Sequence, residues 1–185
     1  MKNWQKSAVA VLALAAFPGP AHAANASCLS GEEAQAIALA LLPEALEATA
    51  QTCAPTLPEG SLLKRADAPL FERYRASREP ATPLAQSAIA RITGMAGNKQ
   101  VAAASLDLVR AMILPSLSKE IKTQDCGAIN RMIELLEPLP PENLAGVFAT
   151  ILQITARDEA RKAAREGKQP ADKSGLNICP IGETR

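Results

Sequence analysis

The chain has 185 residues, with 20 Lys plus Arg, 19 Asp plus Glu, a formal net charge of +1 and 3% aromatic residues. A nearly neutral chain has no electrostatic basis for generic nucleic-acid binding, and so few aromatic rings exclude a base-stacking or sugar-stacking platform. The length fits one domain that can bury a proper hydrophobic core.

The first 23 residues have the organisation of a secretory signal peptide. Lys2 and Lys6 precede an apolar run from Ala8 to Phe17, and a Pro-Gly-Pro break leads to Ala21-His22-Ala23. The run of about ten residues is shorter than the roughly 20 that cross a bilayer, and no later stretch reaches that length without charges. We therefore expect residues 1–23 to be removed and the mature chain to be periplasmic or secreted, soluble and without a membrane span.

Cleavage would also remove the only Trp and the only His, Trp4 and His22. The remaining 162 residues hold 18 basic and 19 acidic side chains, and their aromatic residues are Phe71, Tyr74 and Phe148. Without histidine, the mature chain cannot use a Ser-His-Asp or Cys-His relay or a His-ligated metal. We therefore expect no metal and no cofactor, and we assign no catalytic residue.

Four cysteines remain in the mature chain, Cys28, Cys53, Cys126 and Cys179, and their even number predicts two structural disulfides. No C-x-x-C pair is present, which argues against thioredoxin-like exchange and against a four-thiolate zinc site. A straight helix would hold Cys28 and Cys53 roughly 30 Å or more apart, so that bridge, with Cys126–Cys179, requires a hairpin at Pro43. We favour the alternative, in which both bridges join the first half of the chain to the second.

Hydrophobic periodicity predicts helices and no strand of alternating polarity. The sequence Ser30-Gly31-Glu32-Glu33 fits a capping box that starts the first helix. This helix should continue to Thr52, with a kink near Pro43 because proline lacks the N–H donor. The Pro- and Gly-rich stretch 53–68 predicts a connector.

Two short helices are expected after the connector. The first covers Pro69 to Ser77 with Asp67 as its cap, and Thr82-Pro83 opens the second, because proline is tolerated at the first helical position. The sequence Gly94-Met95-Ala96-Gly97 should end that second helix.

Three further segments are also predicted to be helical. The first begins at Asn98 and is kinked or shortened by Pro115. The next is capped by Asp125 and ends before the break Pro138-Leu139-Pro140-Pro141. The last helix begins in that break, and its charged second half, from Arg157 onward, should be solvated.

The expected fold is therefore all-α, an irregular antiparallel bundle of about five or six helices with two disulfides. The chain divides into a signal peptide at 1–23, a helical domain at 24–167 and an irregular tail at 168–185 that docks through Cys179. A helical bundle by itself says little about function.

Carboxylates are the only general acids or bases present in number on the predicted helices, namely Glu32, Glu33, Glu44, Glu47, Asp107, Glu134 and Glu137. A spacing of three places Glu44 with Glu47, and Glu134 with Glu137, on one helical face. A hydrolase that uses two carboxylates would need such a pair in a cleft with one pKa raised, and its candidates are Glu134 or Glu137 with Asp107. A solvated helix face is the favoured interpretation of each pair.

Three segments carry charge patterns that also occur at binding sites. Gly94 to Lys99 combines glycine, a helix start and a lysine but matches no phosphate-loop pattern, so a helix stop is favoured over an anion site. Lys64-Arg65 and Arg73 to Arg78 are interrupted by acids, which favours a mixed-charge surface over a site for an acidic partner or anionic headgroups. Arg157 to Arg165 could bind a partner, but a helix extension with i, i+4 ion pairs is favoured.

The function that this sequence supports best is a non-catalytic exported module that binds a protein partner or a small apolar ligand between its helices. Apolar stripes on every predicted helix would supply the walls of a site, and the connectors 53–68 and 94–98 its mouths. Protein binding would require an exposed apolar patch of several hundred Å². The alternatives are the histidine-free hydrolase or lyase with a carboxylate pair, and a structural component of an envelope assembly.

Overall fold

The computed structural model describes residues 28–65, 67–95, 99–168 and 178–181, and the predicted signal peptide lies outside them. The α-helices are α1 (Gly31–Cys53), α2 (Pro69–Ile92), α3 (Lys99–Glu120), α4 (Cys126–Leu136) and α5 (Pro141–Glu166). Three short 3-10 helices are η1 (Ala54–Thr56), η2 (Leu62–Lys64) and η3 (Thr123–Asp125). The described part of the chain holds no strand, only an isolated bridge between Leu29 and Ile178. The predicted all-α fold with two disulfides is confirmed.

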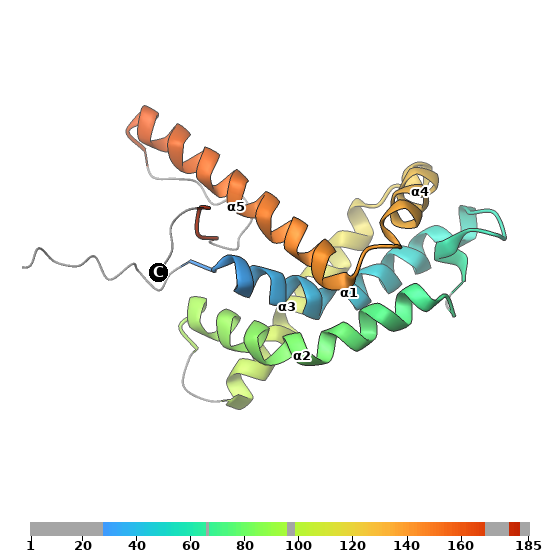
Figure 1. The fold of residues 1–185 in the computed structure, drawn as a ribbon, viewed down its shortest axis with the longest axis horizontal. Helices are drawn as coiled ribbons and strands as arrows, with labels where there is room; N and C mark the ends of the chain where they lie inside the picture. The colour runs from blue at the N-terminus through green and yellow to red at the C-terminus, as the bar shows by residue number, and fades with distance from the viewer. Residues whose placement is uncertain (1–27, 66, 96–98, 169–177, 182–185) are drawn as a thin grey trace, which may run out of the picture.

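The central element is α1, against which α2, α3 and α5 all pack (Figure 1). Residues 36–42 of α1 are apolar at every position, and Ala36, Ile37 and Ala40 are among the buried side chains. The neighbouring helices meet it largely with alanines of the same core cluster: Ala81, Ala85 and Ala88 of α2 and Ala145 and Ala149 of α5. Because alanine favours helix and has a short side chain, helices packed through it can approach closely.

A second core cluster surrounds the Cys53–Cys126 disulfide. The connector after α1 belongs to this cluster, since Leu62 and Leu63 of η2 are buried there with Phe71 and Tyr74 of α2. The Leu63 backbone N–H donates to Asn130 Oδ1 of α4 over 3.0 Å. The connector is therefore packed, and it helps to hold α4.

The expectation of two short helices between Pro69 and Gly94 is wrong, because α2 is one continuous helix from Pro69 to Ile92. Pro80 and Pro83 both lie inside it, and both are exposed, so the carbonyls that lose a donor face the solvent side of the helix. A proline inside a helix costs about 3 kcal/mol, and burial of the alanine face of α2 on α1 offsets that cost. The N-cap is Ala68, without a side-chain hydrogen bond, and not Asp67 as predicted.

The other helix ends match the sequence predictions only in part. The capping box is confirmed, since Glu33 N–H donates to Ser30 Oγ over 3.2 Å and Ser30 N–H to Glu33 Oε2 over 2.8 Å. Gly94, with φ of 70°, follows the end of α2 as predicted. Pro115 does not shorten α3, which continues to Glu120. Asp125 occupies the N-cap position of α4, but its side chain makes no capping hydrogen bond.

The disulfides join the two halves of the chain, as favoured from the sequence. Cys28 is bonded to Cys179 and Cys53 to Cys126, and α1 runs without interruption between Cys28 and Cys53, which excludes a bridge between those two. The Cys179 N–H donates to the Leu29 carbonyl over 2.8 Å. The end of the tail is thereby held against the start of α1.

Replacing Cys53 and Cys126 together by alanine is expected to lower the free energy of unfolding by about 4 kcal/mol, because their bridge closes a long loop in the unfolded chain, with 73 residues separating the two cysteines. Equilibrium urea unfolding followed by circular dichroism measures this loss. The Cys28 and Cys179 pair, 151 residues apart, should lose at least as much when replaced in the same way. A loss below about 1 kcal/mol for either pair would contradict the prediction.

Candidate functional site

Two of the carboxylates considered for catalysis, Glu44 and Glu47, are bound by arginines. Glu44 accepts from Arg78 over 2.7 Å and lies 3.4 Å from Arg110, and Glu47 accepts from Arg75 over 2.9 Å. These contacts join α1 to α2 and α3, so they stabilise helix packing.

The candidate acids Asp107 and Glu134 are not brought together by the fold. Asp107 on α3 accepts from Arg110 over 2.9 Å, whereas Glu134 on α4 accepts from Asn130 Nδ2 over 2.7 Å. The neighbour of Glu134 along the helix, Glu137, contributes its backbone carbonyl to Arg73. Since α3 and α4 make at most marginal contact with each other, no described cleft unites Asp107 with Glu134. Within the described ranges, no cluster of His, Cys, Asp and Glu could hold a metal ion.

Glu33 is the buried acid of the structure, and its position is structural. Its carboxylate caps α1 through Ser30 N–H and accepts from Arg91 Nη2 of α2 over 2.7 Å. The same guanidinium nitrogen donates to the Cys28 carbonyl over 3.1 Å. This ion pair therefore joins the start of α1, the end of α2 and the Cys28–Cys179 bridge. Glu32 beside it is exposed.

The basic segments behave as the mixed-charge surface expected from the sequence. Lys64 pairs with Glu59 over 2.6 Å, and Arg75 also pairs with Glu72 over 3.1 Å. The two aromatic residues beside these charges, Phe71 and Tyr74, are buried and unavailable to a partner. Of the glycine segment 94–99, residues 96–98 and the Lys99 side chain lie outside the description, so its anion interpretation is untested.

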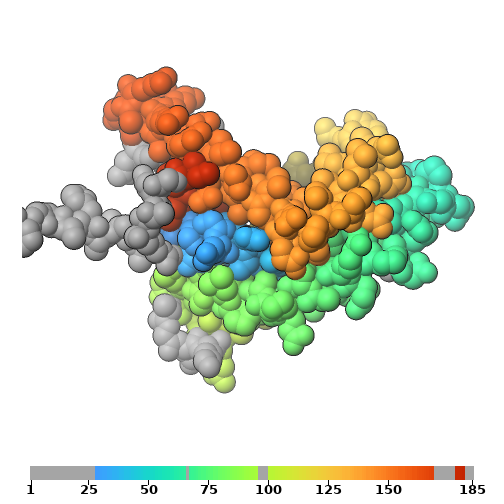
Figure 2. Space-filling model, in the orientation of Figure 1, coloured from blue at the N-terminus to red at the C-terminus, as the bar shows by residue number. Residues whose placement is uncertain are grey.

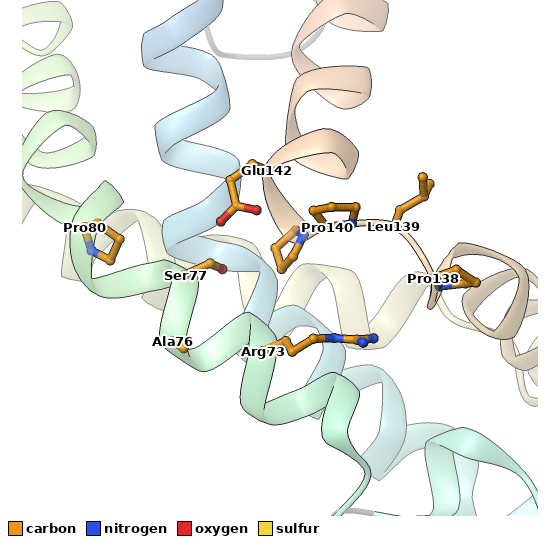
Figure 3. A pocket seen from close by; sticks show the side chains of 9 residues that line it. Arg73, Ala76, Ser77, Pro80, Pro138, Leu139, Pro140 and Glu142 are labelled. Carbon is orange, nitrogen blue, oxygen red and sulfur yellow. The ribbon is translucent and has the colours of Figure 1, made fainter.

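A pocket of about 480 Å³ opens between α2 and the break that precedes α5 (Figure 3). Its lining residues are Arg73, Ala76, Ser77, Pro80, Pro138, Leu139, Pro140, Pro141 and Glu142. Although its volume is within the range of ligand sites, the pocket is a shallow, open depression and does not enclose a small molecule.

The polar groups of this pocket have structural partners. Arg73 Nη2 donates to the Glu137 carbonyl at the end of α4 over 2.7 Å, where a cation also complements the helix dipole. Ser77 Oγ donates to the Tyr74 carbonyl over 2.9 Å. Figure 3 shows Glu142, in the first turn of α5, extending toward Ser77. The pocket thus offers proline rings and few unused hydrogen-bonding groups, which makes it a weak candidate for a specific ligand site.

Tyr74 lies beneath this region. Burial raises the pKa of its hydroxyl, nearby Arg73 lowers that pKa, and Glu142 raises it. The phenol is therefore favoured over the phenolate in the folded chain.

The strongest candidate site is a pair of uncovered apolar faces. The first, called here the α4–α5 face, consists of Met132 and Leu135 of α4, Leu139 of the break and Val147, Phe148, Ile151 and Ile154 of α5. Leu135 is 62% exposed and Phe148 49%, although both belong to residue types that are usually buried. Figure 2 shows the surface hollowed between α4 and the projecting second half of α5.

The second uncovered face lies on α3. Residues Gln100–Glu120 are long and apolar enough to cross a membrane by length and composition alone, and 11% of the most apolar window is buried. The sequence contains no later stretch of that length without charges, and this helix carries Asp107 and Arg110. Those two residues form an ion pair with each other, and Arg110 also donates to the Ala40 carbonyl of α1.

These faces were not found from the sequence. The apolar stripes of the predicted helices were expected to form the walls of a site between helices, and periodicity cannot distinguish a stripe that meets a neighbour from one that does not. For α5, the sequence did hold an indication of an uncovered apolar face, because residues 143–156 carry no charge.

Replacing Arg91 by methionine is expected to lower the free energy of unfolding by about 3 kcal/mol, because it removes the cation that pairs with the buried Glu33 carboxylate over 2.7 Å. Urea unfolding measures the change. The matched control is Arg75→Met, which removes an ion pair with Glu47 that is exposed and should change stability little. Equal losses for the two variants would show that the Glu33 pair has no special structural role.

Tyr74, the only tyrosine of the chain, is expected to ionise above its ordinary pKa of 10. Because its pKa is higher in the folded state, its contribution to stability is present at neutral pH and is lost as pH rises through that folded value. Ultraviolet absorbance titration follows this single group. Glu142→Gln should lower the pKa and Arg73→Met should raise it, and shifts of the opposite sign would refute the assignment.

Comparison with known proteins adds no functional information. No protein-family model matches this chain, and neither a curated protein nor a solved structure matches it. Its function therefore has to be argued from the side chains that the fold leaves uncovered.

Proposed function

We propose that this protein is a non-catalytic exported module that binds a protein partner through the α4–α5 face. The observation that carries the proposal is the exposure of large apolar side chains on two neighbouring elements: Met132, Leu135, Leu139, Val147, Phe148, Ile151 and Ile154. Large apolar side chains that gather in solvent along a helix usually mark a site of interaction. Methionine and aromatic side chains are also enriched at protein interfaces.

A protein is favoured over a small apolar ligand as the occupant. The apolar side chains of this face point outward along α4 and α5, and the described pocket nearby is open and lined mainly by proline. Ligand sites for small molecules enclose most of the ligand surface, which an outward helix face cannot do. A helix or loop of another protein can cover such a face.

Charge on α5 indicates what the partner should carry. The apolar first half of the helix is followed by Arg161, Lys162 and Arg165, which are exposed and form no ion pair with a described residue. This second half projects beyond the body of the molecule (Figure 1). A segment that lies along α5 would gain both apolar burial and charge pairing if its apolar residues were followed by acidic ones.

Two disulfides fit an oxidising compartment, since such bonds persist in the periplasm and outside the cell. Together with the sequence of residues 1–23, this supports export to the periplasm or the medium. The partner should therefore be an exported protein, or the exported part of an envelope protein.

The test is site-specific photo-crosslinking in the intact host. A photoreactive residue at position 151 should give one discrete protein adduct, because Ile151 is 54% exposed at the centre of the apolar half of α5. The matched control carries the photoreactive residue in place of exposed Glu79 on α2 and should give no such adduct.

Two further variants test the chemistry of the contact. Phe148→Asp should weaken the adduct at position 151 by roughly 30-fold, the loss expected for an interface residue worth about 2 kcal/mol. Replacing Arg161 and Lys162 together by glutamine should weaken it less and reduce its dependence on salt. The absence of an adduct at position 151, or equal adducts at positions 151 and 79, would refute the proposal.

A further inference from the structure

The outward face of α3 carries a regular apolar stripe that the α4–α5 face does not include. Its residues are Val101, Ala104, Leu108, Ala111 and Pro115, and all are exposed. They follow one another at spacings of three, four, three and four, the repeat of a helix that packs along another helix. The opposite side of α3, through fully buried Leu106, already packs in the core with α1 and α2.

Large and small side chains alternate along this stripe. Val101, Leu108 and Pro115 occupy one of the two positions of the repeat, and Ala104 and Ala111 occupy the other. When two copies of the helix run antiparallel with the axis between residues 109 and 110, position 108 of one copy faces position 111 of the other. Leu108 and Pro115 then each face an alanine of the other copy, and Val101 faces Ser118, so each large residue meets a small one.

Charge does not oppose this pairing. No charged side chain lies on the stripe, and residues 111–118 are uncharged altogether. The nearest charge is Asp107, which is 71% exposed at the side chain and is neutralised by Arg110 of the same helix over 2.9 Å. A helix that meets its own copy therefore brings no unpaired like charges together.

We infer that the α3 stripe binds a second copy of this chain, giving an antiparallel, two-fold symmetric dimer. A symmetric contact uses the same patch on both subunits, so the stripe has to be complementary to itself, which the alternation of large and small residues provides. This contact lies on a different helix from the α4–α5 face and does not depend on the function proposed for that face.

The exposed area limits the strength of this dimer. A large apolar side chain offers roughly 60–120 Å² of apolar area. The large residues of this side of α3 are between 38% and 58% exposed, namely Val101, Leu108 and Met112. They supply on the order of 200 Å² per copy, well below the roughly 800 Å² per partner of a stable complex. The dimer should therefore be weak and reversible.

A lipid surface is the less favoured occupant of the same face. The helix carries no Trp or Tyr, the residues that anchor helices at a membrane interface, and two of the five stripe positions are alanines. Its length and apolar composition are nevertheless compatible with lipid contact, so the experiment has to separate the two cases.

The test is analytical ultracentrifugation of the exported, disulfide-bonded chain over a range of concentrations. The chain should shift from monomer to dimer as concentration rises, and Leu108→Glu should weaken the dimer at least tenfold. Leu84→Glu is the matched control, because Leu84 is a 41% exposed leucine on α2, outside both faces. Circular dichroism of each variant shows that it is folded.

A second variant separates specific packing from general stickiness. Ala111→Leu enlarges the apolar surface, but it places a large residue opposite Leu108 of the other copy, so it should also weaken the dimer.

Three results would overturn the inference: a monomer at every concentration, an equal effect of the two glutamate variants, or a dimer that Ala111→Leu strengthens. A monomer that floats with phosphatidylglycerol vesicles and loses this binding through Leu108→Glu would overturn it in favour of a lipid surface. The crosslinks at position 151 should be unchanged by Leu108→Glu, so failure of the dimer and failure of the proposed function are distinguishable.

Discussion

A single alanine-rich helix, α1, supplies the packing surface for α2, α3 and α5, and this arrangement determines which sides of those helices stay uncovered. Because the three helices surround α1, each buries the side that faces it, and α3 and α5 make at most marginal contact with each other. Their other sides carry Leu108 and Ile151, which no helix of the described part of the chain covers. The uncovered apolar surface is therefore a consequence of how the core is built, and it is also the surface available for binding.

Covalent and ionic bonds hold this helix at its two ends. At the start, the Cys28–Cys179 bridge and the Glu33–Arg91 ion pair tie α1 to the tail and to α2. At its other end, Cys53 is bonded to Cys126 and so ties α1 to α4. A core rich in alanine buries less apolar area per residue than one of leucine and phenylalanine, so disulfides that restrict the unfolded chain contribute a larger share of the stability.

The packing of three helices around α1 also explains why the charged groups do not form a catalytic site. The helices that surround α1 are joined by arginines from α2 and α3, and Arg78 and Arg110 both approach Glu44. Carboxylates engaged in this way stabilise helix packing and have cations as their nearest charged neighbours. A paired-carboxylate mechanism needs two acids facing one substrate, whereas Asp107 and Glu134 lie on helices that hardly meet. The chemistry available to a partner is therefore mainly apolar contact together with the cations at the end of α5.

Local features were determined by the sequence alone, because they depend on neighbours only a few residues away. The capping box at Ser30 and the stop at Gly94 belong to this class. The even number of cysteines also predicted two disulfides, although these join residues far apart in the chain. Tertiary structure decided the features that depend on distant contacts. It made α2 continuous through Pro80, since burial on α1 outweighs one lost hydrogen bond. It also left Leu108 in solvent, because periodicity shows which residues share a helix face but not whether another helix covers that face.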